Sequence, residues 1–214
     1  MTDASQKDKA KWPLGLVIAA NAVVFYWVVR SKALAPETLL GLNVDPERAI
    51  PAGLALLVAT ALNGLMPVDT KYRIVFLRWS NVLPSYYAFT FYAKRDPRVD
   101  LARLEKVSGG PLPVDPAQQH RLWYRAYKSV QDTPAVAQVN RDFLLMRDWT
   151  AFAVLMLLLG LPAGLYVAES TSFGATYSGA LLLQYLLVRH STATYGERMV
   201  NNVLAEVAAR GAPL

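Results

Sequence analysis

The stretch DPAQQHRLWYRAYK, residues 115–128, combines a helix start with alternating basic and aromatic side chains. Asp115, Pro116 at the first helical position and Gln118 three residues after the aspartate are typical of a helix N-terminus. At 100° per residue, the basic side chains share one narrow stripe and the packing side chains lie opposite. The stripe consists of Arg121, Arg125 and Lys128, and the packing face of Trp123, Ala126, Tyr127 and Val130. The sequence therefore predicts a helix with one packing face and one positive ridge.

This helix belongs to a polar block, Pro67–Asp148, which separates two pairs of long uncharged segments. The block holds 13 of the chain's 22 Lys and Arg residues against 8 acidic residues, and aromatics are interleaved with its bases. Basic side chains beside stacking aromatics are how nucleotides and single-stranded nucleic acids are held. Anionic lipid headgroups, or the ordinary basic character of cytoplasmic segments, are alternative explanations. The candidate ligand-binding residues are Arg121, Arg125, Lys128, Trp123, Tyr124, Lys71, Arg73, Arg78, Lys94, Arg95 and Arg98.

Four runs of 18 to 20 residues contain no Asp, Glu, Lys, Arg or His: 12–29, 49–68, 149–168 and 170–188. About 20 apolar residues, at 1.5 Å per residue, span the hydrocarbon core of a bilayer. A soluble protein with four buried apolar helices is the alternative, but core helices are normally amphipathic. We therefore predict an all-α, polytopic membrane protein, with four transmembrane helices and a helical cytoplasmic domain inserted between the second and third.

The distribution of Lys and Arg predicts the orientation. The N-terminal tail has three, the polar block thirteen and the tail after the fourth run three, whereas the two intervening loops have three and none. Because basic segments stay cytoplasmic, we expect a bacterial inner-membrane protein with both termini and residues 67–148 in the cytoplasm. The expected domains are the tail and first helix pair (1–66), the basic domain (67–148), the second helix pair (149–190) and a cytoplasmic C-terminal helix (191–214).

The first run has an alternative interpretation as a cleaved signal peptide. Ala33-Leu34-Ala35 has the small-x-small pattern of a cleavage site. The run is longer than a usual signal-peptide core, and Arg30 and Lys32 intervene before that site. A retained membrane anchor is therefore favoured.

Three more helices are expected around the spans. One runs from Lys71 to about Val82. Another starts at Thr133-Pro134 and continues without a breaker into the third run, which would couple the polar block to the membrane. The last covers Thr192–Arg210, with one face formed by Tyr195, Met199, Val203 and Val207.

Two kinds of residue stand out inside the runs. Small residues four apart permit close helix contact, and they are Gly160 with Gly164, and Ala175 with Gly179. Intramembrane amides face the protein interior or water rather than lipid. Asn21, Asn63 and Gln184 are therefore candidates either for lining a pore or for hydrogen bonds between helices.

The sequence gives little support for catalysis. It has no cysteine, and its two histidines, His120 and His190, are isolated from any carboxylate cluster at ligand spacing, so no metal site is expected. Neither a glycine-rich phosphate loop nor a nucleophile elbow is present. We expect a protein that is not an enzyme and carries no cofactor.

Four stretches carry a resemblance to a known family: Asn81-Val82-Leu83-Pro84-Ser85-Tyr86-Tyr87-Ala88-Phe89, Asp96-Pro97-Arg98-Val99-Asp100, Leu122-Trp123-Tyr124 and Gly196-Glu197-Arg198-Met199-Val200-Asn201-Asn202-Val203-Leu204-Ala205. With the order of two helices, basic block and two helices, the chain resembles small bacterial membrane effectors of anti-phage defence, of the Hailong type. The resemblance implies a homotetrameric ion channel paired with a nucleotidyltransferase and acting in abortive infection. A single-stranded DNA oligomer made by that partner would hold the channel shut until infection removes it.

These observations lead to one functional hypothesis and one alternative. An anionic nucleotide or single-stranded DNA binds the ridge of Arg121, Arg125 and Lys128 and shifts the helix that starts at Pro134 between closed and open positions of a channel. Because four helices enclose no obvious pore, the channel requires several copies of the chain. The alternative is a non-conducting membrane scaffold that docks a partner protein or anionic lipid through the same surface.

Overall fold

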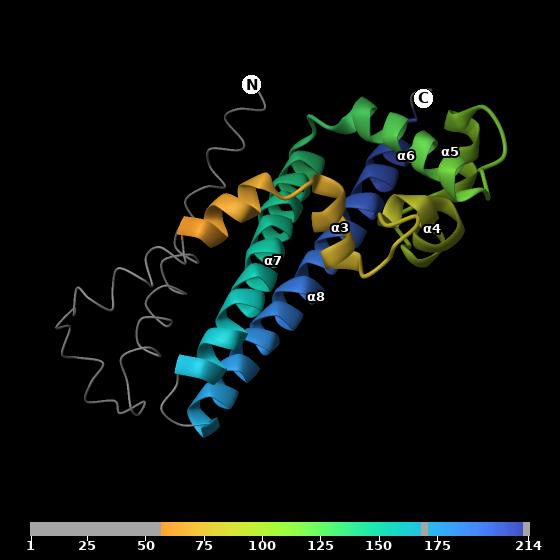
Figure 1. The fold of residues 1–214 in the computed structure, drawn as a ribbon. Helices are drawn as coiled ribbons and strands as arrows, with labels where there is room; N and C mark the ends of the chain where they lie inside the picture. The colour runs from red at the N-terminus through yellow and green to blue at the C-terminus, as the bar shows by residue number, and fades with distance from the viewer. Residues whose placement is uncertain (1–56, 168–170, 212–214) are drawn as a thin grey trace. The chain divides into compact units, whose positions relative to one another are not determined.

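The computed structural model describes residues 57–167 and 171–211, and each element within these ranges is a helix (Figure 1). The all-α prediction is confirmed. Expectations for residues 1–56, which include the first predicted span and Asn21, lie outside the described residues. In chain order the elements are a helix over 57–65, α3 (Val68–Phe76), the 3-10 helix η2 (Pro84–Tyr87), the π-helix η3 (Ala88–Tyr92), α4 (Ala93–Arg95), α5 (Leu101–Ser108), α6 (Pro116–Val130), α7 (Pro134–Val167) and α8 (Thr171–Arg210).

The chain divides into two compact units. Unit 1 takes its described residues from Met1–Lys71 and Asp148–Arg189, and unit 2 from Tyr72–Arg147 and His190–Leu214. The C-terminal stretch, which we expected as a separate helix, therefore belongs to the same unit as most of the polar block. In the sequence, α7 begins in unit 2 and α8 begins in unit 1.

The core of unit 2 collects apolar side chains from η3, α5, α6, α7 and the end of α8. The fully buried ones include Leu104, Ala126, Val136, Val203 and Leu204. The prediction that Thr192–Arg210 is helical is confirmed, and Met199, Val203 and Val207 from its expected apolar face are buried. That stretch is the end of a helix that already begins at Thr171.

Two local expectations in unit 2 were wrong or incomplete. The helix predicted from Lys71 to Val82 ends at Phe76, because Leu77 (φ 50°) and Asn81 (φ 48°) adopt left-handed conformations that a helix cannot contain. Helix α5 was not expected. It begins where the Asp100 side chain accepts a hydrogen bond from the Arg103 amide at 3.0 Å, and it ends at Gly109 (φ 78°).

The helix expected from Thr133-Pro134 is confirmed as α7, which runs from Pro134 to Val167 with Pro162 inside it. Its segment Pro134–Pro162, 29 residues, is the one helix among the described residues that is long and apolar enough to cross a membrane. The four-span count stays a prediction.

In unit 1, the predicted close approach of helices is confirmed at Gly160. A Cβ atom there would lie 2.7 Å from Leu181 Cδ1 and 3.2 Å from the Tyr177 hydroxyl. Gly179 has no other atom within 4 Å of such a Cβ position, so this glycine is not at a described contact. The small core of unit 1 consists of Ala59, Phe152, Met156, Tyr177 and Leu181.

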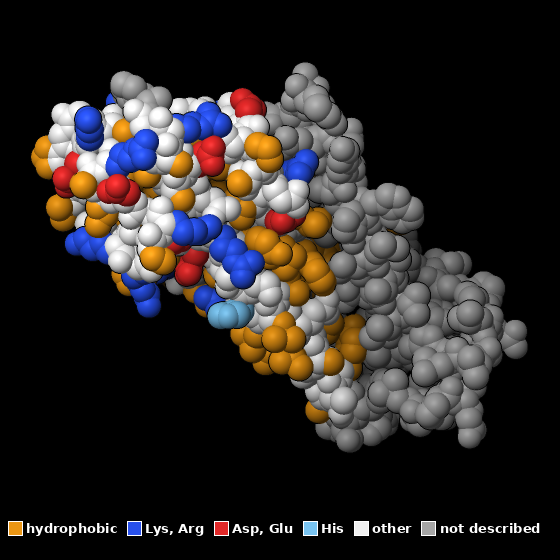
Figure 2. All heavy atoms as spheres, turned by 180° about the vertical axis from the view of Figure 1, so that it is seen from behind, with side chains coloured by type: hydrophobic (Ala, Val, Ile, Leu, Met, Phe, Trp, Pro, Cys, Tyr) orange, Lys and Arg blue, Asp and Glu red, His pale blue; other side chains and the backbone are white. Residues whose placement is uncertain are grey.

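Large apolar side chains remain exposed in unit 1. Figure 2 shows Lys and Arg interspersed with Asp and Glu over unit 2, and hydrophobic side chains gathered over the parts of α7 and α8 that belong to unit 1. The exposed residues of unit 1 are Leu57, Val58, Leu62, Leu65, Val68, Leu158, Leu159, Leu161, Leu182, Leu183, Leu186 and Leu187. Exposed apolar surface of this extent marks a site of contact with a membrane or another protein.

Candidate functional site

Helix α6 forms as its sequence predicts. The Asp115 side chain accepts a hydrogen bond from the Gln118 amide at 2.9 Å, and Pro116 occupies the first helical position. The expected packing face is buried at Trp123, Ala126 and Val130. The expected ridge of Arg121, Arg125 and Lys128 is exposed.

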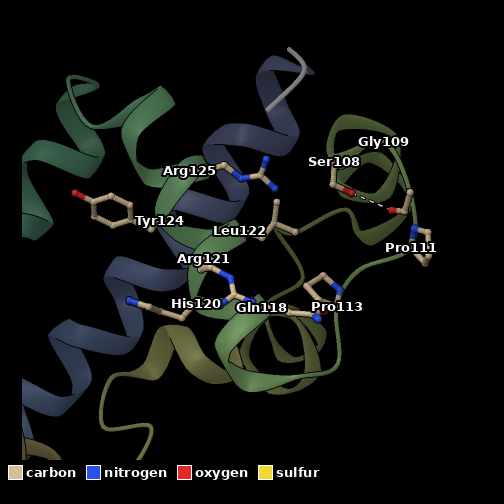
Figure 3. A pocket seen from close by; sticks show the side chains of 11 residues that line it. Ser108, Gly109, Pro111, Pro113, Gln118, His120, Arg121, Leu122, Tyr124 and Arg125 are labelled. Atoms are coloured by element: carbon tan, nitrogen blue, oxygen red, sulfur yellow. Dashed lines mark hydrogen bonds between the residues drawn. The ribbon is translucent and has the colours of Figure 1, made fainter.

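A cavity of about 680 Å³ lies between α6 and the loop that precedes it (Figure 3). Two arginines, Arg121 and Arg125, line it, and no Asp or Glu occurs among its lining residues. The full lining is Ser108, Gly109, Gly110, Pro111, Pro113, Gln118, His120, Arg121, Leu122, Tyr124 and Arg125. No ion pair or hydrogen bond engages the guanidinium of either arginine within the part of the chain that the structure describes.

The loop side of the cavity satisfies its own polar groups. The Gly110 amide donates to the Glu105 carbonyl oxygen at 3.1 Å. The Ser108 hydroxyl lies 3.0 Å from the same carbonyl oxygen and 2.9 Å from that of Gly110 (Figure 3). The lining offers a ligand the guanidinium groups of Arg121 and Arg125 and the side chains of Gln118, His120 and Tyr124 as polar groups. Pro111, Pro113 and Leu122 add apolar surface. This combination suits a phosphate or carboxylate that is joined to a flat or apolar group.

Four rings form a stacked series along the buried side of α6. Tyr86 of η2 stacks on His120 at 4.5 Å between ring centroids, His120 on Trp123 at 6.5 Å and Trp123 on Tyr127 at 5.7 Å. Trp123 is thus part of the packed interior and is not an open platform for a base. Tyr124 is the aromatic candidate that lines the cavity.

His120 connects the cavity to this series. Its Nδ1 atom lies 2.8 Å from the Ser85 hydroxyl oxygen, within a hydrogen bond. Burial lowers the pKa of His120 below its ordinary value of 6.5, because a charged imidazolium would lose solvation there. We therefore expect a neutral ring at physiological pH.

Gln119, which the sequence analysis did not single out, holds α6 against η3. Its side chain is 0% exposed. Its Oε1 atom accepts hydrogen bonds from the Phe89 amide at 3.0 Å and the Thr90 amide at 3.2 Å, and its Nε2 atom donates to the Val114 carbonyl oxygen at 2.8 Å. The signal available in the sequence was a polar residue on the packing face of an amphipathic helix. Its partners come from a distant segment and have no sequence signature.

The remaining candidate cations do not gather in this cavity. Lys128 donates to the Gln131 side chain at 3.1 Å and lies over the Tyr124 and Tyr127 rings. Lys71 is buried and forms an ion pair with Asp148 at 3.0 Å. Arg98 forms an ion pair with Asp96 at 2.7 Å, and this arginine holds the pKa of the Asp96 carboxyl below its usual value.

Three other arginines lie over aromatic rings elsewhere in unit 2. Arg73 lies 5.8 Å from the Trp79 ring, Arg78 5.1 Å from the Tyr87 ring and Arg95 4.7 Å from the Phe91 ring. Lys94 is exposed next to Arg95 in α4. Arg78 lines a second cavity of about 320 Å³ with Tyr87, Phe91 and Tyr92.

The candidate amides in the spans lie in different settings. Asn63 is buried, and its side-chain nitrogen donates to the Asp148 carbonyl oxygen at 3.3 Å. This is the interhelical role. Gln184 is half-buried on α8. Among the described residues, no group of three or more His, Cys, Asp or Glu could hold a metal ion.

Comparison of the chain with family models, with curated proteins and with solved structures finds no match.

Proposed function

We propose that this chain is a ligand-controlled membrane effector. An anionic nucleotide or single-stranded DNA binds at Arg121 and Arg125 and controls ion passage through a homo-oligomer, for which the family resemblance implies a homotetramer. The observation that carries the proposal is the cavity at α6, whose lining contains two arginines and no carboxylate; neither arginine has an acidic partner among the described residues. Anti-phage defence and a nucleotidyltransferase partner are the parts of the proposal that come from the resemblance.

The connection between α6 and α7 can transmit a movement of α6 on ligand binding to the apolar part of α7. Helix α6 ends at Val130, and α7 starts four residues later at Pro134. The turn between them is held by the Thr133 hydroxyl, which donates to the Val130 carbonyl oxygen at 2.9 Å. A ligand that draws α6 toward the Ser108–Pro113 loop would therefore pull on the start of the helix that continues into the third apolar run.

Binding is tested with full-length protein purified in detergent and fluorescent single-stranded DNA. The double variant Arg121→Gln, Arg125→Gln should weaken binding by at least about tenfold, since a hydrogen bond to a charged group contributes about 1.5–3 kcal/mol. The slope of log affinity against log salt should become shallower by about 1.4, because each phosphate contact contributes about 0.7 on a single strand. The control Arg141→Gln, on α7 and outside the cavity, should change neither quantity.

Channel function is tested in liposomes that contain the full-length protein. Ion flux should depend on added single-stranded DNA in the wild type and lose that dependence in the double variant. Liposomes that pass no ions with or without DNA would overturn the channel and leave the non-conducting scaffold. Equal DNA binding by the wild type and the double variant would overturn the assignment of the α6 cavity.

A further inference from the structure

A second concentration of positive charge lies in residues 71–95, outside the lining of the α6 cavity. This stretch contains five basic residues and no Asp or Glu. Lys71 is engaged in its ion pair, and the other four are exposed: Arg73, Arg78, Lys94 and Arg95. A surface segment with this excess of one charge attracts anions.

The loop of residues 77–83 inside this stretch has an unusual backbone. Leu77 has φ 50° and Asn81 has φ 48°. Asparagine tolerates the left-handed region, whereas a leucine there is strained because its Cβ atom lies too close to a backbone carbonyl oxygen. Burial of apolar surface does not offset the strain at Leu77, because Leu77 is 59% exposed and the nearby Trp79 is 84% exposed. A strained loop that exposes two large apolar side chains suggests that these side chains bind a partner.

The second cavity adjoins this loop through Arg78. It is lined by Arg78, Tyr87, Phe91 and Tyr92. The guanidinium carbon of Arg95 lies 4.7 Å from the centroid of the Phe91 ring. The Glu197 carboxylate accepts a long hydrogen bond, 3.5 Å, from the Tyr92 hydroxyl. The cavity thus offers a guanidinium and aromatic faces for one anionic group.

We propose that the loop of residues 77–83 and this second cavity bind the headgroup of an acidic phospholipid. Leu77 and Trp79 enter the membrane interface, where tryptophan prefers to lie, while Arg78 binds the lipid phosphate and Arg95 adds its charge. The sequence position fits, because Leu77 follows Leu65, the last residue of the helix over 57–65, by twelve residues. The proposal rests on the membrane association in the proposed function and is independent of its ligand.

The test uses the full-length protein in vesicles of phosphatidylcholine with phosphatidylglycerol, one of the two brominated near the carbonyl end of its acyl chains. Bromine quenches tryptophan fluorescence on contact. The chain has five tryptophans, so the Trp79 signal is the difference between the wild type and Trp79→Phe. We expect brominated phosphatidylglycerol to quench that signal more strongly than brominated phosphatidylcholine. Arg78→Gln should lower this preference about fivefold, which corresponds to about 1 kcal/mol for one basic side chain near the surface.

Two variants separate lipid binding from folding and from general charge. Leu77→Gly removes the apolar side chain and relieves the left-handed strain, so quenching of Trp79 should fall while the unfolding temperature in detergent does not. Arg121→Gln removes a charge at the α6 cavity and should leave the lipid preference within about twofold of the wild type.

Two results would overturn the proposal. One is a Trp79 signal that neither brominated lipid quenches. The other is an unchanged lipid preference in Arg78→Gln together with a loss of single-stranded DNA binding as large as that of the Arg121, Arg125 double variant. The second result would make the cavity a seat for the soluble ligand. Neither depends on ion flux, so failure here is distinguishable from failure of the channel.

Discussion

The two halves of α8 differ in the exposure of their apolar side chains. In the half that belongs to unit 1, Leu181 packs in the small core, but four leucines are exposed: Leu182, Leu183, Leu186 and Leu187. In the half that belongs to unit 2, apolar side chains are buried: Met199, Val200, Val203, Leu204 and Val207. A helix that keeps its leucines on the outside is suited to an apolar solvent, and one that hides them is suited to water. One continuous helix therefore combines a segment with exposed apolar side chains and a segment with buried ones.

The largest expected effect comes from placing a charge on each kind of exposed apolar site. Leu158 is 64% exposed in unit 1 and lies at the middle of the third apolar run, and Val114 is 76% exposed in unit 2. If the first faces lipid, Leu158→Lys costs about 2.5–3.5 kcal/mol of insertion free energy, whereas Val114→Lys changes stability by less than about 0.5 kcal/mol. The fraction of protein that stays in membranes after an alkaline wash measures the difference.

Val114 is a suitable control because only its backbone is engaged, as the acceptor for Gln119. The comparison between the two units fails if both lysine variants remain in the membrane fraction like the wild type. The exposed leucines of unit 1 would then be better explained by contact with protein.

Local signals in the sequence predicted several elements well. Asp115 with Pro116 placed the start of α6, and Thr133-Pro134 placed the start of α7, since a cap and a first-turn proline act within one turn. The helix from Lys71 failed because apolar residues continue past Phe76 while the backbone turns at Leu77. Nothing in a leucine predicts a left-handed conformation, which depends on the contacts of the folded chain.

The sequence predicted which basic residues could bind an anion, but it did not predict which residues lie together at the candidate site. Helical periodicity placed Arg121 and Arg125 on one face, and the structure brings both to the same cavity. Periodicity could not show that the loop at Ser108–Pro113 forms the other wall, because this depends on how α5 and α6 pack. Nor could it show that Lys71, basic like the others, is buried in an ion pair with a residue 77 positions away.

The second-largest expected effect compares a glycine in the buried half of α8, Gly196, with a glycine in the exposed half, Gly179. A Cβ atom on Gly196 would lie 2.8 Å from Phe76 Cζ and 3.1 Å from Phe143 Cε2, whereas one on Gly179 meets nothing within 4 Å. Gly196→Ala should therefore destabilise unit 2 by about 1–3 kcal/mol through overpacking. Gly179→Ala should stabilise by up to about 1 kcal/mol, because alanine is the better helix former.

Thermal unfolding of the full-length protein in detergent measures both glycine variants. A rise in the unfolding temperature for Gly196→Ala as large as that for Gly179→Ala would contradict the close packing of α8 on the two phenylalanines.

The smallest expected effect concerns His120, whose half-buried ring belongs to unit 2. Because burial lowers its pKa below 6.5, the unfolded chain binds the proton first as pH falls, and stability decreases with pH below about 6.5. Above that pH the contribution is fully present. The carboxylate-free cavity beside Arg121 and Arg125 offers the imidazolium no compensating charge.

Urea unfolding between about pH 8 and about pH 5 should show a shallower pH dependence of stability in His120→Gln than in the wild type. Equal slopes in His120→Gln and the wild type would show that the His120 ring beside Ser85 is not the group that couples protons to the stability of unit 2.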